Sequence, residues 1–246
     1  AMLSSSEDLL DWADALYGDG GLLDPETTEA MLTTPYAVEA EVSYGLGAER
    51  QVMMSYEDRR RTAYHEGGHA IVGMLTPGAD PVRKVSIIPR GMALGVTFSA
   101  PDADRFSYLE PEILAKIKGA LGGRAAEEIV FGEISTGAES DLEQLTALAR
   151  QMVGRWGMSE ALGPISVFPR DGSGPFLPGA AEVAPETRKL VDEEVRRIVA
   201  EAHDEVVTLL TENRARLDAL ASALLEHETL DEDDVYAAAG VTRSFS

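Results

Sequence analysis

The sequence predicts a mainly α-helical fold with a small β-sheet or hairpin beside one central helix and a bundle of helices at the C-terminus. Apolar residues recur at helical spacing in three internal segments and again from residue 186 onward. Two short runs rich in β-branched residues, 82–89 and 94–99, predict the strands. These patterns indicate a helical domain with a minor β component.

Composition narrows the classes of function. The 246 residues carry a formal net charge of −22, and a surface this acidic repels nucleic acid and anionic lipid. The chain has no cysteine, so it forms no disulfide framework and no cysteine-based metal or catalytic site. Its longest run without a charged residue, 67–79, is shorter than the roughly 20 residues that span a bilayer. We expect a soluble, cytoplasmic chain, a reading that is compatible with a membrane-anchored parent.

Charge and composition also divide the chain. Residues 1–50 are predicted to form an acidic N-terminal appendage, because residues 1–49 contain no lysine or arginine. A domain is expected over 51–246, with a proline- and glycine-rich mobile loop at about 169–185 and C-terminal helices over 186–240. Breaks in the helical pattern are expected near 212–213 and 227–231.

The central helix is the first strong element. Ser55 with Asp58 is an N-terminal capping pattern, and the helix should continue to about Thr76, where Pro77 and a glycine stop it. The two predicted strands follow, and the turn residues 89–91 between them indicate a hairpin or a pair of adjacent strands.

Two further helices follow the strands. Pro111 suits the first turn of a helix over about 111–129, which Gly122 and Gly123 are expected to loosen. The next helix, over about 136–156, is indicated by an apolar stripe at helical spacing.

The chemistry-bearing motif lies in the central helix, where His65, Glu66 and His69 form the pattern His-Glu-x-x-His. A four-residue spacing puts both imidazoles on one helix face, one turn apart, as two ligands of a tetrahedral zinc ion require. Glu66 then lies close enough to take a proton from the water that zinc activates. The alternative is that the two histidines simply lie on a polar helix face. The helix is otherwise apolar around them, and burying two histidines and a glutamate there without a metal ion would carry a desolvation cost. The apolar neighbours are Ala63, Ala70, Ile71 and Val72.

A third protein ligand is required. The long form of the motif would place a histidine ten positions after His65, but that residue is Leu75, so this arrangement is excluded. His203 and His227 lie among acidic residues in the C-terminal helices and read as surface residues. A carboxylate is therefore expected, and spacing alone leaves four candidates open: Glu127, Glu128, Glu139 and Asp141.

Several separate segments together resemble the peptidase domain of the FtsH family of AAA metalloproteases, over roughly residues 50 to 238. They are 62–70 (TAYHEGGHA), 79–91 (ADPVRKVSIIPRG), 121–132 (LGGRAAEEIVFG), 135–138 (STGA), 141–143 (DLE) and 157–164 (GMSEALGP). Their common order makes the resemblance more specific than the zinc motif alone.

The resemblance implies a role for each matching position. His65 and His69 correspond to the family's histidine ligands, Glu66 to its catalytic glutamate and Asp141 to its aspartate ligand. Glu127 matches an acidic position for which a supporting role, or a salt bridge to a neighbour such as Arg124, is expected. The implied cofactor is Zn²⁺.

We therefore expect a zinc metalloendopeptidase that cleaves peptides or unfolded proteins, with Glu66 as general base. An extended substrate could pair with a strand edge at 85–88 or 96–99. The alternative is a catalytically silent FtsH-like scaffold or interaction subunit of a protease complex. Family resemblance implies a homo-oligomer, a hexamer.

The chain departs from the family at two points. The first variable position of the zinc motif is usually alanine in the family and is Gly67 here, which costs the helix roughly 1 kcal/mol. The sequence contains no Gly-x-x-x-x-Gly-Lys-Ser/Thr phosphate loop, so cleavage by this chain is expected to be independent of ATP. The acidic front end favours a divergent or stand-alone member.

Overall fold

A computed structural model describes residues 54–89, 94–103, 105–168 and 183–243, together with the backbone of three short strands nearer the N-terminus. The chain divides into two compact units, Ala1–Met53 and Met54–Ser246. In the first unit, β1 (Tyr36–Ala37), β2 (Ser43–Gly45) and β3 (Ala48–Glu49) pair antiparallel in sequence order. The rest of the predicted appendage, the turn at 90–93 and most of the predicted 169–185 loop lie outside the described residues.

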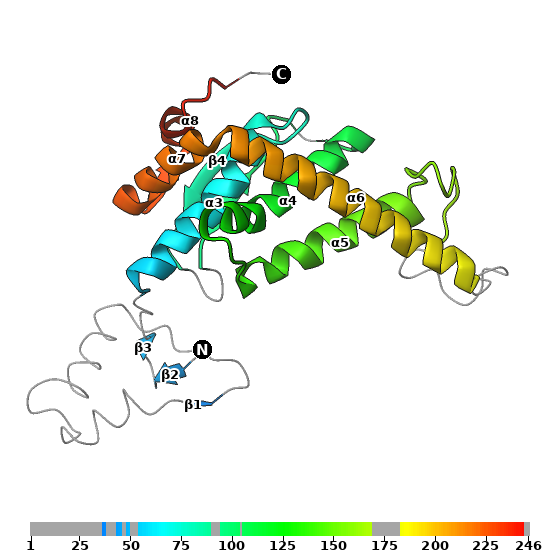
Figure 1. Ribbon diagram of the computed structural model, residues 1–246, viewed down its shortest axis with the longest axis horizontal. Coiled ribbons are helices and arrows are strands. Elements are labelled where there is room, and N and C mark those ends of the chain that lie inside the picture. Colours follow the sequence, from blue (N-terminus) through cyan, green and yellow to red (C-terminus); the bar gives the residue numbers. More distant parts are fainter. Residues whose placement is uncertain are drawn as a thin grey trace, which may run out of the picture. The chain divides into compact units, whose positions relative to one another are not determined.

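The second unit is mainly helical, as the sequence predicts (Figure 1). Its helices are α3 (Tyr56–Leu75), α4 (Glu110–Phe131), α5 (Glu139–Gly154), α6 (Pro185–Glu212), α7 (Arg214–His227) and α8 (Glu232–Ala239). A 3₁₀ turn, η1 (Thr136–Ala138), leads directly into α5. Figure 1 shows the long α6 crossing α4 and running beside α5.

The helix ends follow local chemistry. Ser55 caps α3, since its Oγ accepts a hydrogen bond from the backbone N–H of Asp58 at 3.1 Å. At α4, the side chain of Glu112 accepts a hydrogen bond from the N–H of Leu109 at 2.7 Å. Gly132 ends α4 with a left-handed φ of 69°, a conformation that costs glycine little.

A three-stranded antiparallel sheet lies against α3, with the strand order β5-β4-β6. Its members are β4 (Val82–Ser86), β5 (Val96–Ser99) and β6 (Thr229–Asp231). The sequence predicts β4 and β5, which do pair, but it shows β6 only as a break between helices. Three residues are too few to establish a strand periodicity, and β6 depends on its pairing with β4.

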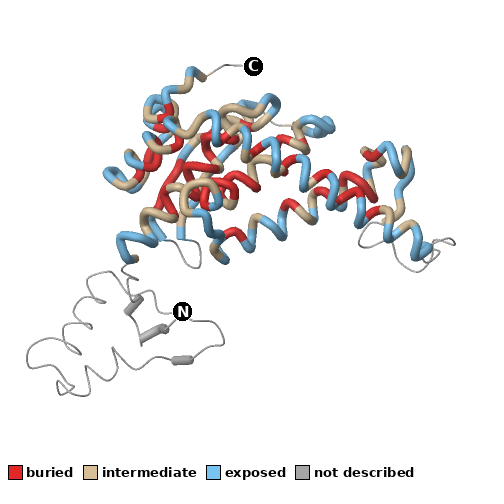
Figure 2. Tube along the Cα trace, viewed as in Figure 1, coloured by how far each residue is buried: buried red, intermediate tan, exposed pale blue. Residues whose placement is uncertain are grey.

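The core is centred on α3 and α4. Figure 2 shows buried residues concentrated along these two helices and where α5 meets α6. The largest fully buried side chains there include Ile71 of α3 and Ile117 and Leu121 of α4. Burial of this apolar area at about 25 cal/mol per Å² supplies the main stabilisation of the unit.

Two glycines allow α3 and α4 to approach unusually closely. A Cβ added to Gly68 would stand 2.3 Å from the carbonyl oxygen of Gly122, and one added to Gly122 would stand 2.7 Å from the carbonyl oxygen of Gly68. The expectation that Gly122 and Gly123 loosen the helix is wrong, because α4 continues through both residues. Glycine at positions 68 and 122 therefore allows the two helices to pack closely and does not interrupt either helix.

Candidate metal centre

Three side chains from two helices meet at the face where α3, α4 and α5 come together. His65 and His69 project from α3 one turn apart, and their Nε2 atoms lie 3.1 Å from each other. Asp141, in the first turn of α5, places Oδ2 3.3 Å from Nε2 of His65 and 3.4 Å from Nε2 of His69. These are the only residues in the described part of the chain that form a group able to hold a metal ion.

The spacing of the three donor atoms suits zinc. A tetrahedral zinc ion with ligands at 2.0–2.1 Å separates its ligand atoms by about 3.3–3.4 Å, close to the three separations found here. Two imidazole nitrogens and one carboxylate oxygen form a donor set that zinc accepts. Three protein ligands also leave a fourth position, which is the pattern of catalytic rather than structural zinc sites.

The second nitrogen of each histidine is fixed by an acceptor. Nδ1 of His65 lies 2.8 Å from Oε1 of Glu127, and Nδ1 of His69 lies 2.8 Å from the carbonyl oxygen of Gly119. Because these oxygens accept hydrogen bonds, the Nδ1 atoms donate, and the Nε2 atom of each ring faces the centre of the group.

Glu127 is the most heavily engaged carboxylate of the site, with a side chain only 2% exposed. Besides His65, it accepts hydrogen bonds from the backbone N–H and hydroxyl of Ser135, at 2.9 and 3.0 Å, and from Arg61 at 3.1 Å. Burial raises its pKa, but the hydrogen bonds from His65, Ser135 and Arg61 outweigh burial and lower the pKa to about 2. Its salt-bridge partner is Arg61, rather than the Arg124 that the sequence suggests.

The electrostatics of the group favour a cation. Burial lowers the pKa of His65, but hydrogen bonds to Asp141 and Glu127 outweigh burial and raise the pKa to about 9. Burial likewise raises the pKa of Asp141, whereas hydrogen bonds from His65 and His69 hold it well below its usual range. Surroundings that stabilise positive charge so strongly at neutral pH are suited to a divalent metal ion.

Glu66 is buried, with 6% of its surface exposed, between α3 and β5. The hydroxyl of Thr97 donates a hydrogen bond of 2.7 Å to Oε2 of Glu66. The backbone just before β5 also comes close, since a Cβ added to Gly95 would stand 2.7 Å from Oε1. Glu66 therefore lies beside the histidine pair without joining the donor group.

The other sequence candidates lie elsewhere. Glu128 contacts His203 at 3.2 Å on the surface between α4 and α6. Glu139 is exposed at the start of α5. His227 is exposed at the end of α7. Of the four carboxylates that spacing leaves open, only Asp141 reaches the two Nε2 atoms and only Glu127 reaches an Nδ1 atom.

Sequence reasoning missed Gly123 as a residue of the site. A Cβ added to it would stand 2.5 Å from Nε2 of His65 and 2.6 Å from Nε2 of His69. The backbone of α4 thus forms one wall of the site, which requires a residue without a side chain. The pair Gly122 and Gly123 in an otherwise regular helical pattern is the signal that could have found it.

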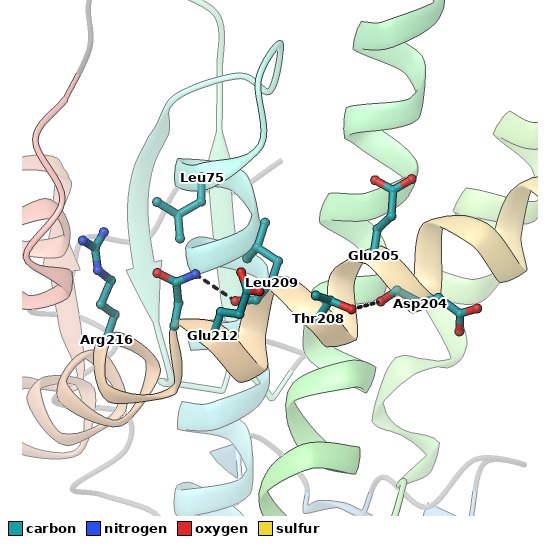
Figure 3. A pocket seen from close by; sticks show the side chains of 8 residues that line it. Leu75, Asp204, Glu205, Thr208, Leu209, Glu212 and Arg216 are labelled. Carbon is teal, nitrogen blue, oxygen red and sulfur yellow. Dashed lines mark hydrogen bonds between the residues drawn. The ribbon is translucent and has the colours of Figure 1, made fainter.

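A shallow hollow elsewhere on the surface lacks such chemistry (Figure 3). It is lined by Leu75 at the end of α3, by the last turns of α6 and by Arg216 of α7. Its carboxylates, Asp204, Glu205 and Glu212, come without a histidine, and Glu205 pairs with Lys118 at 2.6 Å. The metal centre remains the candidate functional site.

Replacing the Glu127 carboxylate tests whether its hydrogen bond with Nδ1 orients His65 for zinc binding. We expect Glu127→Gln to raise the Kd for zinc by about 10- to 100-fold, as loss of an outer-shell partner of a ligand histidine does. Competition with a chromogenic chelator measures this Kd. Glu128→Gln, one residue along α4 and directed at His203, is the matched control and should bind zinc like the unaltered chain. Unchanged zinc affinity in Glu127→Gln would show that Glu127 serves only the fold.

A helix that carries His-Glu-x-x-His beside a carboxylate on a second helix defines the class of zinc metallopeptidases. Comparison with known protein families identifies the family within this class. Residues 52–238 match Peptidase family M41, and the chain belongs to this family.

Relatives with this domain are zinc proteases. The chain is 63% identical over 226 residues to the ATP-dependent zinc metalloprotease FtsH 3 of Conexibacter woesei, an alignment that covers 92% of this chain and 30% of the relative. It is 52% identical to the ATP-dependent zinc metalloprotease FtsH of Thermobaculum terrenum, over 77% of this chain and 30% of the relative. The FtsH of Syntrophus aciditrophicus is also 52% identical, over 80% of this chain and 27% of that protein. The chain thus spans about a third of the length of these relatives or less. No helix within the described segments is both long and apolar enough to cross a membrane.

Proposed function

We propose that this chain is a zinc metalloendopeptidase that cleaves peptides or unfolded proteins. In this proposal His65, His69 and Asp141 hold the zinc ion and Glu66 is the general base. The observation that carries the proposal is the meeting of two Nε2 atoms and one carboxylate oxygen within 3.1–3.4 Å of one another, directly beside a buried glutamate. Domain assignment is part of the proposal: residues 51–246 form the peptidase domain, and residues 1–50 are an acidic appendage.

The reaction needs a water molecule, a base and an acid. Zinc bound by the three ligands would lower the pKa of a water molecule and polarise the peptide carbonyl. Glu66 accepts the proton of the attacking water on Oε1, because Oε2 is engaged by Thr97. The protonated Glu66 then gives this proton to the amine that leaves.

An extended substrate would pair with β5. In the described sheet β4 lies between β5 and β6, so β5 has a free edge and β4 does not. Thr97 of β5 touches Glu66, so a peptide along this edge would pass close to the base. Exposed Val96 and Phe98 on the same strand offer apolar contacts to its side chains.

We further infer that cleavage by this chain needs no ATP, since its sequence has no phosphate-binding loop. The relatives' names describe ATP-dependent proteases, and the part aligned with this chain covers only 30% of each of these two relatives. Oligomeric assembly, a hexamer by family resemblance, belongs to the same proposal.

Hydrolysis of fluorescein-labelled casein, with and without added zinc, tests the function through two variants. Glu66→Gln should keep zinc but lose roughly 10²- to 10⁴-fold in kcat/KM, the usual contribution of a general base. Asp141→Ala should lose both zinc affinity and activity. ATP should have no effect on the rate.

Each contrary outcome has a definite meaning. Wild-type activity in Asp141→Ala would show that the third ligand is misassigned. Wild-type activity in Glu66→Gln would show that Glu66 is not the general base. A chain that binds one zinc ion tightly but does not cleave casein would instead be an autoinhibited enzyme or a silent scaffold.

A further inference from the structure

The Glu66 carboxylate has a hydrogen-bond partner that the zinc motif does not predict. The hydroxyl of Thr97, on β5, lies 2.7 Å from Oε2 of Glu66 and 3.1 Å from the backbone carbonyl oxygen of Glu66. A hydroxyl donates a single proton, and an ionised carboxylate is the stronger acceptor. The shorter contact therefore takes the proton.

The register of the sheet directs the Thr97 side chain toward α3. Thr97 pairs with Val85 of β4, which pairs in turn with Leu230 of β6, and both partners are buried. Side chains alternate along a strand, so Val96 and Phe98 lie on the opposite face and are exposed. A threonine at this register position is therefore fixed by strand pairing rather than by a flexible loop.

Gly95 brings the strand close enough for this contact. A Cβ at this position would stand 2.7 Å from Oε1 of Glu66, 2.8 Å from its Cγ and 2.9 Å from the carbonyl oxygen of Ser86. The carboxylate is thus held between the Thr97 hydroxyl on Oε2 and the backbone of Gly95 beside Oε1. Within the described residues, Thr97 is the sole hydrogen-bond donor to this carboxylate.

We propose that Thr97 is a positioning residue that holds the Glu66 carboxylate by Oε2 and so directs Oε1 toward the reacting water. This inference rests on the proposed function, in which Glu66 is the base. Proton transfer requires the base within hydrogen-bond reach of the water in a defined orientation, and a carboxylate free to rotate meets that condition less often. Thr97 acts on the rate through Glu66 and does not itself touch the substrate.

Two variants separate the hydroxyl from the shape of the side chain. Thr97→Val keeps the β-branched shape and removes the hydroxyl, and we expect it to lower kcat on fluorescein-labelled casein by about 10- to 100-fold. KM should change by less than about twofold and the Kd for zinc should stay constant. Thr97→Ser, a separate variant that keeps the hydroxyl, should have a kcat within about threefold of that of the unaltered chain. Thr211→Val, the same substitution at an exposed position of α6, is the matched control and should leave kcat unchanged.

A stability cycle tests the contact without any activity measurement. Loss of a hydrogen bond to a charged group should lower the melting temperature in Thr97→Val by roughly 3–10 °C. The same substitution in a Glu66→Ala background should cost little, because the carboxylate is already gone. If the hydroxyl instead served the Glu66 backbone carbonyl, the loss would be equal in both backgrounds.

The outcomes are distinguishable from failure of the proposed function. Unchanged kcat in Thr97→Val, loss of zinc affinity in parallel with activity, failure of serine to restore the rate, or equal thermal losses in both backgrounds would each overturn the role of Thr97. Wild-type activity in Glu66→Gln would instead overturn the part of the proposed function on which this inference rests, the role of Glu66 as general base. The stability cycle decides whether the contact forms, whatever casein hydrolysis gives.

Discussion

Substitution of Gly123 by alanine is expected to abolish zinc binding and, with it, peptidase activity. The new Cβ would stand 2.5 Å from Nε2 of His65 and 2.6 Å from Nε2 of His69, less than van der Waals contact allows. Both rings would have to rotate or α4 would have to withdraw from α3. Because each change moves a ligand, the zinc Kd should rise by more than the roughly 10- to 100-fold that loss of an outer-shell partner costs.

Chelator competition and casein hydrolysis measure this effect, and α4 supplies a close control. Gly119 lies one turn earlier in the same helix, and a Cβ there meets no atom within 4 Å. Gly119→Ala should bind zinc normally and stabilise the helix by up to about 1 kcal/mol, since alanine has the higher helix propensity. Normal zinc affinity in Gly123→Ala would contradict a site walled by the α4 backbone.

The second large effect is expected from Gly68→Ala. A Cβ at Gly68 would stand 2.3 Å from the carbonyl oxygen of Gly122 and 2.6 Å from the Cβ of Ala126. Backbone atoms cannot turn aside as a side chain can, so α3 and α4 must separate and their shared core must repack. We expect the free energy of unfolding to fall by about 3 kcal/mol or more, at or beyond the upper end of overpacking effects. Urea denaturation measures it.

The neighbouring glycine is the comparison that isolates the cause. A Cβ at Gly67 would stand 3.2 Å from Cδ1 of Leu217, the far end of a flexible side chain. Gly67→Ala should therefore change stability by less than about 1 kcal/mol, because gain in helix propensity offsets a small shift of Leu217. A similar loss in both variants would mean that added side-chain volume anywhere on this part of α3, rather than the close approach of α3 and α4 at Gly68, causes the destabilisation.

Local sequence signals predict the elements and the central motif. Ser55 marks the start of α3, Pro77 marks its end, and the four-residue spacing of His65 and His69 places both on one face. The spacing of acidic residues cannot select among Asp141 and its rivals, because that choice depends on how α5 packs against α4 and α6. Family resemblance selects Asp141, and the structure brings this residue to the histidines.

Other features depend on contacts between distant segments and leave little trace in the sequence. Gly123 faces residues more than fifty positions away, and Thr97 reaches Glu66 only through the register of the sheet. A glycine in a helix reads as a weak point when taken alone, and a threonine in a strand reads as an ordinary β-former. Their roles become visible only when the opposing backbone or carboxylate is in place.

The group of His65, His69 and Asp141 also joins parts of the chain that are far apart in sequence, because the two histidines lie on α3 and Asp141 lies in the first turn of α5. In polymer terms, a metal ion held by these residues ties a loop of about 70 residues that contains the sheet strands β4 and β5 and the whole of α4. In the chain-entropy model, a closed loop of this length restricts an unfolded chain by roughly 4–5 kcal/mol. The residues proposed to bind zinc would thus also cross-link distant parts of the chain, so the metal-bound form, which is the one proposed to be active, would be the form most resistant to unfolding.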